Sequence, residues 1–197
     1  MASFVLAVLF LIITPGPGVL SLAGVGSAFG YSHGLRYLAG LFVGTNLVCL
    51  AVISGLAALV LAEPGLRVVL TMASAAYLLW LAFRIAFAGT RVAFIEQPGP
   101  PGIRGGILLQ AVNPKAYVVN TTLFSGFAFM TEHPLFEIGI KLLLLNILWT
   151  AIHVAWLCAG VTVRRMNLPE RWQRGINVGM AGAMLAVVAL AALAPQG

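Results

Sequence analysis

Lys115 is the residue of this chain with the clearest potential for chemistry, because its charge lies within a long apolar stretch. It directly follows Asn113 and Pro114, so a helix is expected to break where the charge lies. An ammonium near the middle of a bilayer costs about 2.5–3.5 kcal/mol on insertion scales, which makes it a candidate for function. Without a nearby Asp or Glu, its partners are expected to be backbone carbonyls, a side-chain dipole or a substrate anion. The alternative is a structural lysine that ties a loose helix end through carbonyls.

A second break is expected in the first apolar run, where the segment TPGPGVL at 14–20 carries two prolines and two glycines. A half-helix that starts after Gly18 would present unpaired N–H groups and a positive dipole end, which suit a carboxylate. Carbonyls left open before Pro15 and Pro17 could accept from an ammonium. An amino-acid zwitterion carries both groups. The alternative is a proline kink that neighbouring helices stabilise, but a break in a second run favours function.

Polar side chains recur on one face of the fifth apolar run, where Asn146, Thr150 and His153 follow an i, i+4, i+7 spacing. Hydrogen bonds between helices are the favoured interpretation of this stripe. His153 is also a candidate proton relay, as is Lys115, because the ordinary pKa of histidine lies near neutrality. The residues expected to bind substrate flank the two breaks or form a polar pair in the second run. They are Thr14, Pro15, Gly16, Pro17, Gly18, Thr45, Asn46, Asn113, Pro114 and Lys115.

The sequence predicts neither a metal site nor a catalytic site. His33 and His133 fall in different connections, and Cys49 and Cys158 are scattered without carboxylates at ligand spacing. No nucleophile–base arrangement and no phosphate-binding loop occurs. We therefore expect no enzyme activity, no metal and no cofactor.

Composition indicates what must hold these residues in place. The chain is 61% hydrophobic and 8% charged, with a mean hydropathy of +1.03, which is typical of a polytopic membrane protein and excludes an ordinary soluble domain. The net charge of +6 would suggest nucleic acid in a soluble protein. Here the basic residues fall mostly between apolar runs, so membrane orientation explains them and no nucleic-acid partner is expected.

The apolar runs predict an all-α integral membrane protein with six transmembrane helices in two inverted three-helix repeats. The first repeat is expected over 1–88, a cytoplasmic Pro/Gly-rich linker over 89–104 and the second repeat over 105–197. Helices 1 and 4 would be broken at PGP and NPK, and paired breaks of this kind indicate a transporter's central site. The expected spans are 3–24, 37–62, 68–88, 105–128, 138–160 and 175–194.

The distribution of Lys and Arg predicts the orientation of these spans. Connections 1, 3 and 5 hold eight of these residues, while connections 2 and 4 hold two, Arg67 and Lys141. By the positive-inside rule the odd connections are cytoplasmic and both termini lie on the outer, periplasmic side.

Several motifs resemble the LysE/RhtB-type amino-acid exporters over nearly the whole chain. They are TPGP at 14–17, the series Gly30, Gly34, Gly40 and Gly44 with GLAAL at 55–59, SAAYLLWLAF at 74–83, NPKA at 113–116, and the Asn177…Gly182 pattern. The resemblance implies a six-helix protein of the cytoplasmic membrane that exports amino acids or related metabolites with the proton-motive force. It also implies Pro15, Gly16, Pro17, Asn113, Pro114 and Lys115 as signature residues.

This chain departs from that resemblance after Gly44, where many members carry an acid and this chain has Thr45 and Asn46. Without that carboxylate, a small neutral amino acid fits better than lysine or arginine. The prediction is therefore a secondary transporter of the inner membrane that exports small neutral amino acids.

Several alternatives stay open. Within transport they are the export of another small metabolite, or of a metal or inorganic ion. From other classes they are an intramembrane enzyme and a membrane scaffold. The expected partners are the amino acid and the lipid bilayer, and glycine-rich helix faces would permit a homodimer.

Overall fold

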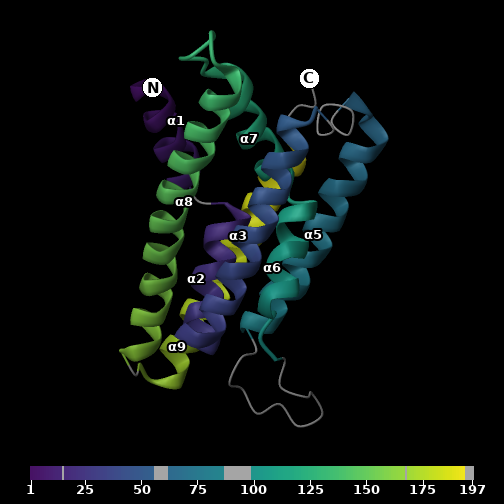
Figure 1. The fold of residues 1–197 in the computed structure, drawn as a ribbon. Coiled ribbons are helices and arrows are strands. Elements are labelled where there is room, and N and C mark those ends of the chain that lie inside the picture. Colours follow the sequence, from purple (N-terminus) through teal and green to yellow (C-terminus); the bar gives the residue numbers. More distant parts are fainter. Residues whose placement is uncertain (15, 56–61, 87–98, 167, 194–197) are drawn as a thin grey trace.

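Helices are the only regular secondary structure in the described part of the chain. The computed structural model describes residues 1–197 apart from 15, 56–61, 87–98, 167 and 194–197 (Figure 1). Its helices are α1 (Ala2–Ile13), α2 (Pro17–Phe29), α3 (Tyr31–Ile53), α5 (Pro64–Ala86), α6 (Gly102–Val112), α7 (Pro114–Gly126), α8 (Pro134–Arg165) and α9 (Glu170–Leu193). The prediction of an all-α membrane protein agrees with this architecture in class.

Two pairs of consecutive helices are separated by short junctions, and in each pair the second helix begins with a proline. α1 ends at Ile13 and α2 begins at Pro17, and the two axes differ by 51°. α6 ends at Val112 and α7 begins at Pro114. Proline suits the first position of a helix because its missing N–H would have no partner there. In Figure 1, α1 and α7 occupy the upper end of the molecule, and α2 and α6 lie below them.

Fewer helices than predicted are long and apolar enough to cross a membrane. In the described part of the chain α3 and α8 meet this requirement, and α1 with α2 would make a third span if the bent pair is counted as one. At 1.5 Å per residue, a helix needs about 20 residues to cross a ~30 Å hydrocarbon core, so a half-helix of 12 residues does not suffice alone. The six spans, the inverted repeat and its 1–88 and 105–197 halves stay predictions.

Helix bounds also differ from the predicted connections. α2 and α3 meet at Gly30, whose φ of 85° is readily adopted only by glycine, so helix replaces most of the polar connection expected there. α6 begins at Gly102, inside the predicted linker 89–104. Residues 87–98 of that linker lie outside the described residues.

Lys141 does not belong to a polar connection, contrary to the sequence-based assignment. α8 begins at Pro134, and Lys141 is only 2% exposed within its second turn. Its Nζ lies 2.8 Å from Glu137 Oε1 and donates to Phe124 O at 3.2 Å. Glu137 in turn accepts from the backbone N–H groups of Phe129 and Met130. This cluster ties the end of α7 to the first turns of α8.

Glycines bring the central helices into backbone contact. α2 is buried from Pro17 to Ser27, and a Cβ added at Gly160 of α8 would collide with the backbone of Ala23. Gly40 of α3 meets the backbone carbonyl of Ile103 of α6 in the same way. Small residues at such contacts are typical of helix packing in membranes.

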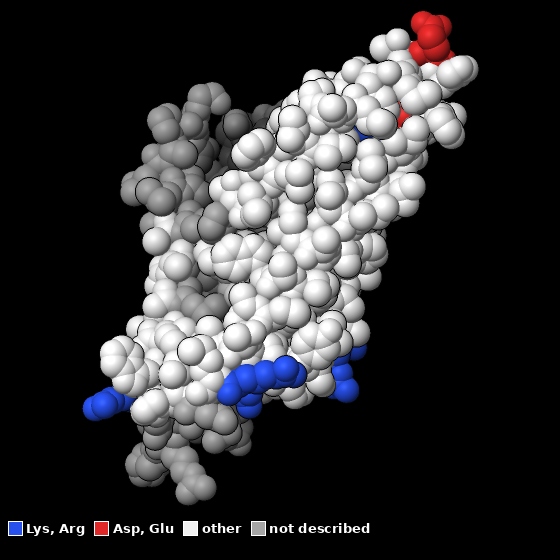
Figure 2. Space-filling view, turned by 90° about the vertical axis from the view of Figure 1, so that its left-hand side faces the viewer, with Lys and Arg blue, Asp and Glu red and all other residues white. Residues whose placement is uncertain are grey.

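The charged side chains gather at the two ends of the face seen in Figure 2, with most of the basic residues at the lower end and the acidic residues, beside a small basic patch, at the upper end. A broad band without charge separates them on that face. This distribution suits a molecule that crosses a bilayer, and the orientation of its termini stays a prediction.

Candidate functional site

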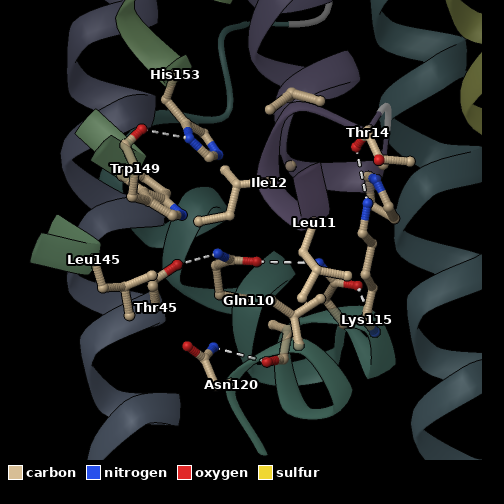
Figure 3. Close-up of a pocket in the computed structure, with 17 residues that line it drawn as sticks. Leu11, Ile12, Thr14, Thr45, Gln110, Lys115, Asn120, Leu145, Trp149 and His153 are labelled. Carbon is tan, nitrogen blue, oxygen red and sulfur yellow. Dashed lines mark hydrogen bonds between the residues drawn. The ribbon is translucent and has the colours of Figure 1, made fainter. Parts of the chain in front are cut away.

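A cavity of about 60 Å³ opens where the two helix junctions meet α3 and α8 (Figure 3). It is lined by 17 residues. Those among the predicted site residues are Thr14, Gly16, Pro17, Gly18, Thr45, Asn113, Lys115 and His153. Asn46, Pro114, Asn146 and Thr150 do not line it, and Pro15 lies outside the described residues.

Lys115 joins the start of α7 to the end of α1. Its Nζ donates to the carbonyl of Thr14 at 2.8 Å. Its side chain lies along Gly16, where an added Cβ would stand 2.9 Å from Cδ and 3.0 Å from Nζ. An ammonium has three N–H donors, so the bond to Thr14 leaves donors for a further partner.

The N-terminus of α2 faces the cavity without a cap. Gly16 is extended, with φ −152° and ψ 177°, and no side chain caps the helix. Leu20 makes the first backbone bond, to Gly16 O at 3.1 Å. The N–H groups of Gly18 and Val19 therefore have no partner within the helix, and both residues line the cavity.

A chain of hydrogen bonds runs from α7 through α6 to α3. The N–H of Lys115 donates to Asn113 Oδ1 at 3.1 Å, and Asn113 Nδ2 donates to Gln110 Oε1 at 3.1 Å. Gln110 Nε2 then donates to Thr45 Oγ1. Gln110 was not among the predicted site residues. Its signal was a polar residue within an apolar run, three positions before Asn113 and thus on the same helix face.

Asn120 and Trp149 are further lining residues that the sequence analysis did not select as binding residues. Asn120 Nδ2 donates to Ala116 O at 2.7 Å, and its Oδ1 lies 3.2 Å from Cys49 Sγ. Cys49 is accordingly a buried residue held by an amide, as expected of a small core side chain. Nothing in a single sequence distinguishes Asn120 from the polar residues beside it.

His153 is fixed against its own helix. Its Nδ1 lies 2.8 Å from Trp149 O, and its ring stacks on the Trp149 ring with centroids 3.5 Å apart and planes 16° apart. A Cβ added at Gly18 would stand 3.6 Å from His153 Nε2. The imidazole thus faces the first turn of α2 across the cavity.

The remaining members of the polar stripe lie elsewhere. Asn146 of α8 and Asn46 of α3 exchange two amide hydrogen bonds, of 2.9 and 3.0 Å. This pair links two helices, and an interhelical role for the whole stripe stays a prediction.

The cavity carries positive charge without an acid. Among its lining residues only Lys115 and His153 have titratable side chains, and none is Asp or Glu. In the part of the chain that the structure describes, no group of three or more His, Cys, Asp or Glu could hold a metal ion. A carboxylate-bearing ligand matches the surplus of donors better than a simple cation does.

Comparisons with known proteins identify the family of this chain. The "LysE type translocator" family matches residues 9–196. Over 174 residues the chain is 34% identical to a cysteine/O-acetylserine efflux protein of Klebsiella pneumoniae subsp. pneumoniae, covering 85% of each chain. It is 32% identical over 173 residues to the protein of the same name from Salmonella choleraesuis, covering 86% of this chain and 85% of that one. No solved structure matches. This membrane protein belongs to the LysE type translocator family.

Proposed function

We propose that the protein exports a small neutral amino acid across the cytoplasmic membrane, driven by the proton-motive force. The observation that carries the proposal is a single cation, Lys115, beside an uncapped helix N-terminus in a cavity with no lining acid. A carboxylate would accept hydrogen bonds from the Lys115 ammonium and from the N–H groups of Gly18 and Val19, and would offset their positive charge. A cationic amino acid would bring a second positive charge that nothing in the cavity neutralises.

The names of the relatives support this substrate class. Cysteine and O-acetylserine, which name the similar efflux proteins, are small amino acids without a charged side chain at neutral pH. The cavity of about 60 Å³ is small as well. In the proposed arrangement Thr14, Gly16, Pro17, Gly18, Asn113 and Lys115 surround the carboxylate, with Thr45 on the opposite side of the cavity. Pro15 and Pro114 would act through the backbone around the junctions, and Asn46 through its amide pair with Asn146.

Transport would proceed by alternating access in a protein of two three-helix repeats, 1–88 and 105–197, with odd connections in the cytoplasm and both termini outside. Lys115 stays charged in this scheme and His153 is the candidate proton relay.

The test is flux into liposomes that contain the purified protein under an imposed pH gradient, with labelled L-cysteine and a panel of neutral amino acids. Lys115→Ala should abolish flux while the protein keeps its elution volume and tryptophan fluorescence. Arg36→Ala, which removes an exposed cation outside the cavity, is the matched control and should transport as the wild type does. Normal flux in Lys115→Ala would refute the site, and flux of a divalent metal ion instead would support the metal-export alternative.

A further inference from the structure

The ring nitrogens of His153 have different surroundings. A carbonyl oxygen only accepts hydrogen bonds, so Nδ1, 2.8 Å from Trp149 O, carries a hydrogen in both the neutral and the cationic ring. Stacking on Trp149 fixes the orientation of the His153 ring. Protonation therefore changes only Nε2. In the neutral ring Nε2 carries a lone pair and accepts hydrogen bonds, and in the cation it carries a hydrogen and donates.

Nε2 faces the space above the first turn of α2. Glycine at position 18 leaves that space open, because an added Cβ would lie 3.6 Å from Nε2. Within the described chain no hydrogen bond reaches Nε2, whereas the ring as a whole is only 4% exposed. Nε2 is not among the described buried atoms that lack a partner, so it borders the open cavity, where a ligand can donate to it.

The two polar ends of the cavity lie beside residues that are two positions apart. Lys115 lies beside Gly16 and His153 beside Gly18, so the two side chains flank the same turn of α2. A carboxylate at Lys115 and the N–H groups of α2 would direct the ammonium of the same molecule toward Nε2. The carboxylate also offsets the charge of Lys115 and the positive end of α2, which would otherwise repel an ammonium.

We infer that His153 Nε2 is a shared acceptor, which holds either the substrate ammonium or a proton but not both. This inference rests on the proposed export function and specifies its coupling. Because one lone pair cannot hold both, loading from the cytoplasm requires the proton to leave, and release outside lets Nε2 take up another. Each zwitterion that leaves is then exchanged for one entering proton, so one positive charge moves inward per cycle.

Few titratable side chains surround His153, so His153 is the group that changes charge in this exchange. α1 and α2 contain no titratable side chain in Ala2–Ile13 and Pro17–Phe29. From α3, α6 and α7, the cavity receives Thr45, Gln110, Asn113, Asn120 and Lys115, of which only Lys115 is titratable, and α8 adds only His153 itself. Because no carboxylate lines the cavity, none competes with the imidazole for the substrate ammonium.

The experiment is equilibrium binding of L-cysteine, kept reduced, to the purified protein between pH 7.5 and 4.5, where its carboxylate and ammonium stay charged. Competition with a proton should weaken wild-type binding progressively toward the acid end, since each pH unit below the pKa of the competing group gives up to about tenfold. His153→Gln should bind more weakly at pH 7.5 and show no such decline. His133→Gln, the same change at an exposed histidine, should behave as the wild type.

Two further measurements separate this role from a structural one. 3-Mercaptopropionate, which is cysteine without its amino group, should bind wild type and His153→Gln equally at pH 7.5. Gly18→Ala, which keeps His153 but places a methyl at ordinary contact distance from Nε2, should weaken only L-cysteine. Wild-type binding that is independent of pH or tighter in acid, or a decline that persists in His153→Gln, would overturn the inference. No binding of L-cysteine to the wild type at any pH would overturn the proposed substrate class, and this inference with it.

Discussion

Replacing Gln110 with leucine tests the hydrogen-bonded chain that positions Lys115. Gln110 is 4% exposed and bonds both Asn113 and Thr45. Leucine has a similar size and no polar atoms, so the main effect is that Asn113 Nδ2 and Thr45 Oγ1 lose their partners. Each unsatisfied buried group costs about 1–3 kcal/mol. Because both groups face a cavity that admits water, we expect the lower part of the summed range, about 2–4 kcal/mol of the free energy of unfolding.

The assay is thermal unfolding in detergent, followed by tryptophan fluorescence. At ~2–4 °C per kcal/mol for a chain of this size, Tm should fall by roughly 4–16 °C. Adding Thr45→Val to Gln110→Leu should cost less than the sum of the single changes, since the hydroxyl has already lost its partner. Thr122→Val, which removes an exposed bond within one helix, is the control and should change stability by less than ~0.5 kcal/mol. An unchanged Tm in Gln110→Leu, or strict additivity with Thr45→Val, would refute the chain as described.

Three other changes have defined outcomes. Gly160→Val brings a Cβ against the backbone of α2 and should lower the free energy of unfolding by about 1–3 kcal/mol, measured as a lower Tm; an unchanged Tm would contradict the close contact. Lys141→Met leaves the Glu137 carboxylate without its cation, so the double variant with Glu137→Gln should melt at a higher temperature than Lys141→Met alone. Asn113→Ala removes the side chain that caps α7 and should cost about 0.5–2 kcal/mol, whereas Asn113→Asp, which can still accept that bond, should cost less.

What the sequence predicts best here depends on local chemistry. Proline ends or starts a helix through its own ring and missing donor, so the helix ends near Ile13 and Val112 follow from a few adjacent residues. The interpretation of Lys115 as a donor to carbonyls is also local, because it needs only a charge beside a break. The bond to Thr14 O has that chemistry, although its partner lies 101 positions away.

What the sequence does not predict depends on which distant faces pack together. Gln110 is one of several polar residues in apolar runs, and only its contact with Thr45 makes it part of the site. Lys141 looks like a connection residue by charge counting, yet Glu137 one turn earlier and the carbonyl of Phe124 make its burial tolerable. Such partners become visible only when the helices are arranged in space.

The backbone contacts of Gly160 with Ala23 and of Gly40 with Ile103 limit the motions open to the molecule. Where side chains interdigitate, a helix can tilt through a series of rotamer changes. Where two backbones touch directly there are no rotamers to change, so each of these helix–helix contacts either persists or separates along its whole length. The pair α2 and α8 and the pair α3 and α6 should therefore each move as a rigid body. α1, whose contacts are side chains such as Phe4 and Val8, has the freedom to rock against them.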